Sequence, residues 1–232
     1  MAHLTTALDQ AVSDSIIKLI TTHPLGGTKM NPLKSITGTI VSGLVLSLIL
    51  VLATKGMHMV VSPIGSIIIS AHVFAGIVWI GLLYYFNFVQ VPALGDAASD
   101  EGGPGGAGIA KYVAPRALLW FRWGAAFTWI TGALFLYFKG ALHSAFTLGL
   151  MSESGDQYSM TIGIGAWLGT LMLFNVWVLI WPNQKKVLGM VEASAEEIAK
   201  AKNIALLASR SNTLMSFPLI MSMVGAHHGM FM

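Results

Sequence analysis

The sequence predicts an all-α fold, a polytopic membrane helix bundle of about five transmembrane helices with an amphipathic helix at its N-terminus. The first observation is composition: 55% of the 232 residues are hydrophobic and 10% are charged, whereas soluble globular domains carry about 25% charged residues. The second is that long apolar segments alternate with polar ones along the chain. A soluble enzyme and a disordered chain are therefore excluded.

Residues 1–30 form the first expected element, an N-terminal interfacial or cytoplasmic segment. Its apolar residues recur at the spacing of one helix face, which favours an amphipathic helix at the membrane surface, and a frayed tail is the alternative. These residues are Leu4, Leu8, Val12, Ile16 and Leu19. Pro24 closes the segment, and residues 31–232 are expected to form a single membrane domain.

The five spans are expected at about residues 36–53, 66–91, 116–138, 160–181 and 210–227. The Gly-rich residues 92–111 predict a flexible linker, and Pro182 predicts the end of the fourth span. Residues 183–209 predict a soluble helix that continues into the fifth span, with a kink at Pro218. Gly165 and Gly169 predict a small-residue face for close helix packing.

Five spans put the two ends of the chain on opposite sides of the membrane. With the N-terminus inside, eleven of the thirteen Lys and Arg residues fall on the inner side, and Lys55 and Lys139 fall outside. Because cytoplasmic loops carry the excess of positive charge, we expect a cytoplasmic N-terminus and a C-terminus on the outer side. The net charge of +3 is small and dispersed, which does not indicate nucleic-acid binding.

The chain has no cysteine. Disulfides, iron–sulfur clusters, thiolate nucleophiles and covalently attached haem c, which needs C-x-x-C-H, are therefore excluded for these residues. Any metal or haem must be held by His, Met, carboxylate or amide groups. The sequence shows no Ser-His-Asp, paired-carboxylate or H-E-x-x-H pattern, so hydrolysis has no support.

Five of the seven histidines are expected on the side opposite to the cations, whereas His3 and His23 are expected on the inner side. His72 lies about two turns inside the second span, and His227 lies at the outer end of the fifth. An ionisable side chain within a span is costly unless it faces the bundle interior or a partner. Two imidazoles on facing helices can hold a haem iron between them. The sequence therefore predicts haem b bound by His72 and His227.

Two more residues of the second span share the face of His72. Gly76, one turn away, leaves space for a porphyrin against the helix, and Trp79 can pack against the porphyrin edge. One alternative is that His72 is a hydrogen-bonded packing residue. Another is that three further outer-side histidines form a copper or zinc site, namely His58, His143 and His228.

Arg122 and a set of amides mark the inner side of the predicted bundle. Arg122 lies about two turns inside the third span, and Asn87, Gln90 and Asn175 lie at broadly similar depth. One hypothesis is a polar pocket for an anionic or quinone-like substrate. The alternative is that Arg122 reaches the interface and the amides satisfy one another.

Four stretches carry a resemblance to a known family: His72–Gly81, Leu119–Trp123, Asn175–Gln184 and Arg210–Pro218. Together they resemble, over about residues 66–232, the membrane domain of bacterial urate oxidases, the urate oxidase N-terminal family. The resemblance implies a multi-span protein of the bacterial inner membrane whose span histidines match His72 and His227. In that family a c-type cytochrome domain often follows, and urate oxidation is coupled to the respiratory chain. An acidic residue tends to follow the third-span motif, where Gly124 and Ala125 stand here.

The residues leave three functions open. The leading hypothesis is a membrane redox protein that holds haem b near the periplasmic face and passes electrons to a separate c-type cytochrome. The second is an oxidase of urate or a similar small anion. The third is a non-catalytic accessory subunit that assembles with other membrane subunits in the lipid bilayer.

Overall fold

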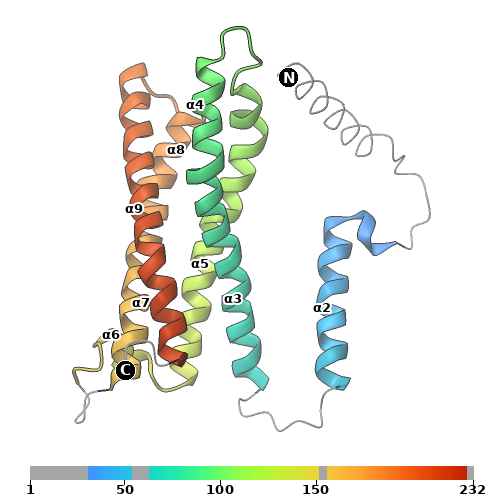
Figure 1. Cartoon of the computed structure of the whole chain (residues 1–232), viewed down its shortest axis with the longest axis vertical. Coiled ribbons are helices and arrows are strands. Elements are labelled where there is room, and N and C mark those ends of the chain that lie inside the picture. Colours follow the sequence, from blue (N-terminus) through green and yellow to red (C-terminus); the bar gives the residue numbers. More distant parts are fainter. Residues whose placement is uncertain (1–30, 54–62, 152–155, 229–232) are drawn as a thin grey trace, which may run out of the picture. The chain divides into compact units, whose positions relative to one another are not determined.

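The computed structural model describes residues 31–53, 63–151 and 156–228, and all the regular structure in these residues is helical, which confirms the predicted fold class (Figure 1). The chain divides into two compact units, Met1–Val60 and Val61–Met232. The predicted N-terminal amphipathic helix and His58 lie outside the described residues.

The first unit contains one long helix in its described part. A short 3₁₀ turn, η1 (Pro32–Lys34), begins where the Asn31 side chain accepts a hydrogen bond from the Leu33 backbone N–H at 3.0 Å. The helix α2 begins at Ile36, where the first span is predicted to begin, and is described as far as Ala53. Its sequence contains no charged residue, as expected for a helix whose surroundings are lipid.

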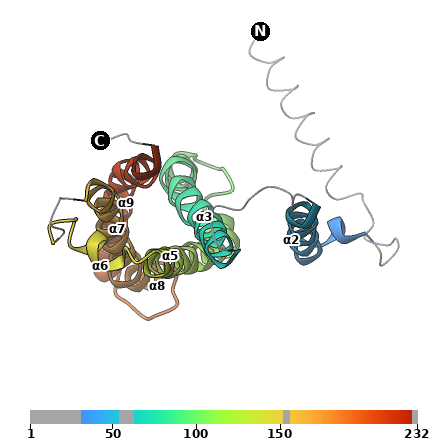
Figure 2. The ribbon, with the colours of Figure 1, turned by 90° about the horizontal axis from the view of Figure 1, so that it is seen from below.

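The second unit is built around four long helices, α3 (Pro63–Tyr84), α5 (Ala114–Phe138), α7 (Gln157–Phe174) and α9 (Ala195–His228). They form a ring in chain order, in which α3 packs most extensively against α5 and α7 against α9 (Figure 2). The core is apolar and includes Trp79, Leu83, Phe121 and Met172. The two hairpins α3–α5 and α7–α9 are therefore the units of packing.

Two of these helices extend beyond their predicted ends through π-helical turns. After α3, the π-helix η2 (Tyr85–Gln90) leads into α4 (Val91–Ser99), and after α7, η4 (Asn175–Ile180) leads into α8 (Trp181–Val187). The expected ends at Val91 and Pro182 are therefore wrong. In each case the proline lies in the first turn of the new α-helical segment, directly after the π-helical turn.

The connections at this end of the bundle are shorter than predicted. The expected linker over residues 92–111 is helical except at 100–106, because α4 precedes it and the π-helix η3 (Ile109–Val113) follows it. Gly102 and Gly105 adopt positive φ in this turn. The predicted soluble helix over 183–209 is interrupted after Val187, where Gly189 also has positive φ, and α9 then runs unbroken through Pro218.

Three helical stretches are long and apolar enough to cross a membrane, namely Ile64–Ser99, Gln157–Val187 and Ala195–His228. Large apolar side chains cover the outer surface of the second unit, among them Phe74, Ile77 and Leu171. Such a surface is expected for a membrane protein and not for a soluble one. The helix α5 carries Arg116 and Arg122 in its first half and is less apolar than α3 and α7.

The predicted small-residue face of α7 lies against α9. The Gly165 backbone N–H donates to the Ser222 hydroxyl oxygen at 3.0 Å, and a Cβ at Gly165 would lie 2.8 Å from the Met223 Cε atom. A Cβ at Gly169 would make an ordinary contact, 3.6 Å from Leu219 Cδ1. Glycine at position 165 thus lets α7 and α9 approach closely, as the spacing predicts, whereas position 169 has room for a methyl group.

The two hairpins share a sequence pattern. The motif W-x-G-x-L-x-x-F-N occurs at Trp79–Asn87 and again at Trp167–Asn175, and A-L-L-x-x-R occurs at Ala117–Arg122 and again at Ala205–Arg210. Both second copies follow the first by the same 88 residues. Because the spacing is kept on both helices of each hairpin, the bundle is built from two copies of one helical hairpin.

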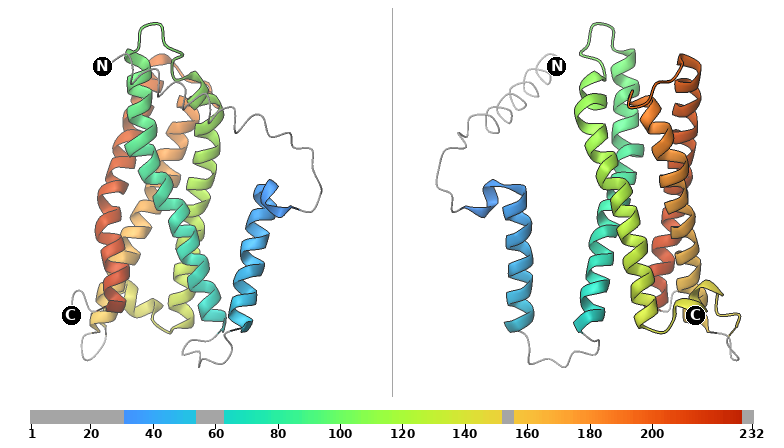
Figure 3. Two further views of the ribbon diagram at one scale, coloured as in Figure 1. Left: turned by 45° about the vertical axis from the view of Figure 1, so that its right-hand side comes forward. Right: turned by 180° about the vertical axis from the view of Figure 1, so that it is seen from behind.

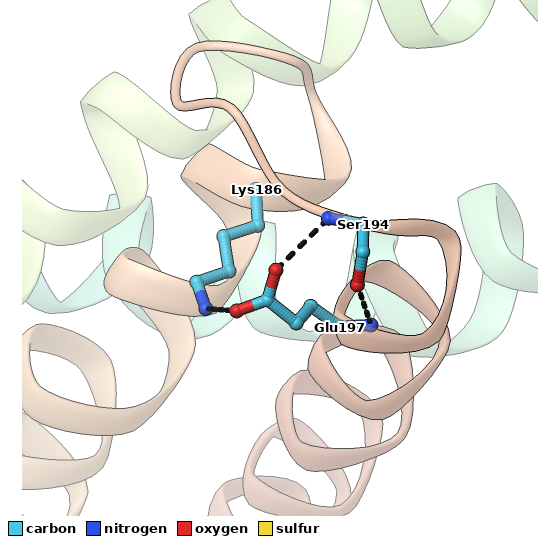
Figure 4. Close-up of polar contacts among 3 residues, drawn as sticks. All are labelled: Lys186, Ser194 and Glu197. Atoms are coloured by element: carbon cyan, nitrogen blue, oxygen red, sulfur yellow. Dashed lines mark hydrogen bonds and ion pairs between the residues drawn. The ribbon is translucent and has the colours of Figure 1, made fainter.

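The helix α9 begins with a reciprocal cap (Figure 4). The Glu197 backbone N–H donates to the Ser194 hydroxyl oxygen at 3.2 Å, and the Ser194 N–H donates to the Glu197 carboxylate at 2.9 Å. Lys186 of α8 lies 3.4 Å from the same carboxylate. This is a capping box, which fixes the start of α9 next to the end of α8.

We expect the Glu197→Gln variant to lose stability at neutral pH and to match the wild type in acid. The Ser194 N–H and Lys186 hold the pKa of the Glu197 carboxyl below its usual range. A carboxyl group whose pKa is lower in the folded state than in the unfolded state stabilises the folded protein at pH values above the unfolded-state pKa. This contribution disappears as the pH falls through the acid range below about 4. Thermal melting of the detergent-solubilised protein between pH 7 and pH 3 measures it. The neighbouring Glu196→Gln substitution is the control, and an equal loss there would contradict the role of the cap.

Candidate functional site

A cavity of about 740 Å³ lies inside the ring of helices. Its lining is almost entirely apolar and comes from α3, α5, α7 and α9, together with Phe146 of the short helix α6 (Leu142–Phe146). His72, Gly76 and Trp79 of α3 line it, and so do His227 and His228 of α9. The fold thus brings together, around one cavity, histidines that are far apart in the sequence.

His72 is held in the cavity wall by one hydrogen bond to the neighbouring helix. Its Nδ1 atom lies 2.8 Å from the backbone carbonyl oxygen of Thr128 in α5. Because a carbonyl oxygen only accepts, Nδ1 carries the proton of this hydrogen bond. In the neutral ring the proton is therefore on Nδ1, and the lone pair of Nε2 is available to a ligand.

Two glycines of α5 allow this placement of the imidazole. A Cβ at Gly124 would lie 3.3 Å from the Trp79 backbone nitrogen, so the absence of a side chain lets α3 and α5 approach closely. A Cβ at Gly132 would lie 2.9 Å from His72 Cε1, so the ring fills the space that a side chain would need. The side-chain pattern of α3 alone does not reveal Thr128 or Gly132 as partners of His72.

His227 lies on the same cavity at the C-terminal end of α9. Its Nδ1 atom is 3.3 Å from the Met223 carbonyl oxygen, one turn back, which again leaves Nε2 as the free ring nitrogen. The Tyr158 ring meets the imidazole edge-to-face with centroids 5.7 Å apart, and Lys139 donates to the Tyr158 hydroxyl at 3.1 Å. The His227 ring is thus positioned by its own helix and by α7.

The remaining outer-side histidines are placed differently. His228 lines the cavity, whereas His143 is exposed on α6 and is not among the lining residues. Over residues 31–53, 63–151 and 156–228, no group of three or more His, Asp or Glu side chains is arranged to hold a metal ion. The proposed copper or zinc site also needs His58, which lies outside these ranges.

Gly76 and Trp79 border the cavity next to His72. A Cβ at Gly76 would meet only the Thr128 Cγ2 atom, at an ordinary 3.8 Å, so this glycine leaves open space beside His72. Trp79 is 2% exposed, and its ring belongs to the apolar core. Its indole Nε1–H has no hydrogen-bond partner among the described residues, which is unusual for a buried donor.

The predicted inner polar set is not gathered around this cavity. The Arg122 guanidinium stacks on the Trp181 ring at 3.8 Å, in a cation–π contact. Asn175 donates to the Asn212 side chain at 2.8 Å, and Asn87 donates to the Ser209 hydroxyl at 2.8 Å. These amides tie the ends of α3 and α7 to α9, which favours the structural interpretation. Within the part of the chain that the structure describes, the side-chain oxygens of Asn87 and Gln90 are buried without a hydrogen-bond partner.

Comparison of the two hairpins of the repeat shows which residues of the cavity lining differ between them. At the positions 88 residues after His72 and Trp79 stand Met160 and Trp167. Trp167 is exposed, and its Nε1–H donates to the Phe146 carbonyl oxygen at 3.1 Å. At these repeat positions the imidazole and the unpaired buried indole therefore occur in the first hairpin and not in the second. The 88-residue spacing could have shown the difference between His72 and Met160 from sequence, whereas the difference between the two indoles appears only in the structure.

Comparison with known proteins agrees with the resemblance over the C-terminal part of the chain. Residues 155–232 match the model of the urate oxidase N-terminal family, a stretch that includes α7, α8 and α9 with His227. The predicted resemblance to this family is thus confirmed for these residues. Neither the curated proteins nor the solved structures give a significant match to the chain.

We expect Gly132→Ala to destabilise the protein by about 1–3 kcal/mol, because the added methyl group displaces the His72 ring and its bond to Thr128. Gly76→Ala is the matched control: its methyl group meets an ordinary contact, and alanine favours a helix by up to about 1 kcal/mol. Chemical or thermal unfolding in detergent measures both variants. Equal stability of the two would contradict the packing of the imidazole against Gly132.

Proposed function

We propose that the protein is an integral membrane redox protein that binds haem b in the cavity between His72 and His227. The observation that carries this proposal is the pair of histidines on one apolar cavity. Each has its Nδ1 atom at a backbone carbonyl and its Nε2 atom available. Ligating histidines in metalloproteins have this arrangement, in which the second ring nitrogen donates to a carbonyl that orients the ring.

The cavity suits a large flat cofactor. Its volume of about 740 Å³ falls within the range of about 300–1,000 Å³ usual for cofactor and ligand sites, and its walls are apolar. Gly76 leaves the space beside His72 open, as a macrocycle lying against α3 requires. Bound there, haem supplies one-electron transfer chemistry.

Haem accounts for the ligand set better than a bare metal ion does. Zinc sites commonly use three or four protein ligands, and the described residues hold no such group. Two axial imidazoles are sufficient for haem iron. Attachment is non-covalent, since the chain has no cysteine.

The orientation in the membrane follows from the charges. Lys185 and Lys186 belong to α8, and Lys200 and Arg210 belong to the first half of α9. Figure 1 shows the start of α9 at the end of the bundle that carries α4 and α8, and the other end of α9 beside α6; Figure 3 shows the same two ends from two further sides. The positive-inside rule puts the first end in the cytoplasm. We therefore place the protein in the bacterial inner membrane as a multi-pass protein, with a cytoplasmic N-terminus, a periplasmic C-terminus and the haem near the periplasmic face.

The partners in this proposal are a separate c-type cytochrome, or other membrane subunits, and the lipid bilayer. The match to the urate oxidase N-terminal family favours a second candidate, an oxidase of urate or a similar small anion. If the protein is an oxidase of urate, urate would reduce the haem. If the protein only transfers electrons to a c-type cytochrome, urate would not reduce it.

An absorption spectrum tests the proposal. We expect the purified protein to show reduced-minus-oxidised b-type haem bands, and His72→Ala to lose most of them because it removes one axial ligand. His227→Ala should have the same effect. The matched control is His143→Ala, because His143 is an outer-side histidine that does not line the cavity. Absence of haem from the wild type, or full retention in His72→Ala, would contradict the proposal.

A further inference from the structure

We propose that the lipid-facing surface between α5 and the α7–α8 helix is a binding site for an anionic phospholipid. Arg122 would bind the phosphate group, Lys185 would add a second positive charge, and an apolar groove beside them would hold an acyl chain. The inference shares the membrane location of the proposed function. It concerns another ligand on another face of the bundle, and it uses neither the haem nor the histidines.

The first observation is a pair of cations around one indole ring. The Arg122 guanidinium carbon lies 3.8 Å from the centroid of the Trp181 ring, and the Lys185 Nζ atom lies 5.9 Å from the same centroid. Arg122 comes from α5, whereas Trp181 and Lys185 come from α8. Two positive charges from separate helices thus attract an anion to the edge of this ring.

The second observation is that the protein does not neutralise these two charges. Lys186, the neighbour of Lys185, lies 3.4 Å from the Glu197 carboxylate. In the described part of the chain, neither Arg122 nor Lys185 has a carboxylate within ion-pair distance. An arginine within a membrane-spanning segment is costly unless it pairs with an anion or reaches the interface. A counter-charge from outside the chain would remove this cost.

The contact with Trp181 leaves the hydrogen-bond donors of Arg122 available. A guanidinium group has five N–H donors, all in its own plane. Stacking on an aromatic ring covers a face of that plane and not its edge. Two parallel N–H groups at the edge match two oxygens of a phosphate group. Trp181 therefore fixes the position of Arg122 without using the donors that a phosphate needs.

The third observation is an apolar groove of about 350 Å³ that begins one turn from Arg122. Ala126 and Ile130 of α5 line one side, and Phe174 of α7 and Trp177 of η4 line the other. Ile130 is 46% exposed and Phe174 is 54% exposed, so the groove opens on the surface of the bundle. In a membrane this surface meets acyl chains.

The groove is almost entirely apolar, and two of its polar side chains are already bonded within the protein. The Trp129 indole N–H donates to the Thr170 hydroxyl oxygen at 2.8 Å, and Thr170 donates to the Ala166 carbonyl oxygen at 2.8 Å. A polar occupant such as a sugar would lose hydrogen bonds to water there without replacing them. An acyl chain needs only the apolar contacts that the groove offers.

The cations and the groove follow each other along the same two helices. Ala126 lies four residues after Arg122, about 6 Å further along α5 on the same helix face. On the other side Trp177 precedes Trp181 by four residues, and its ring meets the Trp123 ring edge-to-face with centroids 5.5 Å apart. A phosphate bound to Arg122 would thus direct its acyl chain along the groove.

The charge selects an anionic phospholipid over a zwitterionic one. A phosphocholine head group carries a quaternary ammonium, which Arg122 and Lys185 repel, whereas phosphatidylglycerol carries only the negative phosphate. Tryptophan and basic side chains together are typical of the head-group level of a membrane, where basic residues attract anionic lipids. A soluble phosphate would use the cations and leave the groove empty.

Arg210 provides a matched control, because it stands 88 residues after Arg122 at the equivalent position of the repeat. It is exposed, and no aromatic ring among the described residues stacks on it. The position equivalent to Trp181 holds Ala93. Two arginines of one motif thus differ in whether an indole ring holds them, and only Arg122 is expected to bind the lipid.

The test is lipid titration of the delipidated full chain in detergent, read by melting temperature and by native mass spectrometry. We expect dioleoylphosphatidylglycerol to raise the melting temperature saturably and dioleoylphosphatidylcholine to raise it much less. Arg122→Gln should bind phosphatidylglycerol about tenfold more weakly, because hydrogen bonds to a charged group are lost. Arg210→Gln should bind it like the wild type. Lys185→Gln serves if Arg122→Gln does not fold, and should also weaken binding.

Equal stabilisation by the two lipids would overturn the proposal, and so would unchanged affinity for phosphatidylglycerol in Arg122→Gln and Lys185→Gln. Glycerol 1-phosphate, which has the phosphate and no acyl chain, separates a lipid from a soluble anion. We expect it not to bind saturably, and binding as tight as that of phosphatidylglycerol would contradict a lipid site.

The same samples distinguish this proposal from the haem proposal. Arg122→Gln should keep its haem bands, and His72→Ala should keep its affinity for phosphatidylglycerol. Haem bands without a preference for phosphatidylglycerol would overturn only the lipid site, and that preference without haem bands would overturn only the haem site.

Discussion

The hydrogen bond between His72 Nδ1 and the Thr128 carbonyl oxygen is the interaction on which the candidate site depends. It joins α3 to α5, fixes which ring nitrogen is protonated, and leaves the other nitrogen to the cavity. The bond requires the two helices to be close, and that closeness depends on Gly124 and Gly132, where a side chain would overlap α3 or the imidazole itself. The two glycines of α5 thus make possible the hydrogen bond that decides which ring nitrogen of His72 in α3 is protonated.

The bundle combines dense and open regions along the same helices. Around Leu83, Phe121 and Met172 the side chains are fully or almost fully buried and form the core. Towards the α6 end the ring of helices encloses the cavity instead. Few of the residues that line it carry a polar group: the three histidines, Thr128, Trp79, Trp129 and Tyr84. An apolar cavity with so few polar groups is typical of a site that receives a hydrophobic ligand.

Sequence reasoning found the helices and the convergence of His72 and His227, because both follow from hydropathy and topology. It gave the start of α2 at Ile36 correctly, since the apolar run begins directly after Lys34 and Ser35. It ended the second and fourth spans too early at Val91 and Pro182, because a π-helical turn before each proline lets the helix continue. It missed Thr128 because a backbone carbonyl acceptor leaves no trace in residue type. It could not distinguish Trp79 from Trp167, because the two residues are of one type and differ only in burial and hydrogen bonding.

The account depends most on the claim that His72 and His227 together hold one haem iron. Electron paramagnetic resonance of the oxidised, haem-loaded protein tests this most directly, because the spin state of ferric haem reports how many strong axial ligands it has. The account predicts a low-spin signal in the wild type that becomes high-spin when either His72 or His227 is replaced by alanine. A high-spin signal in the wild type, or a low-spin signal that survives both substitutions, would contradict it.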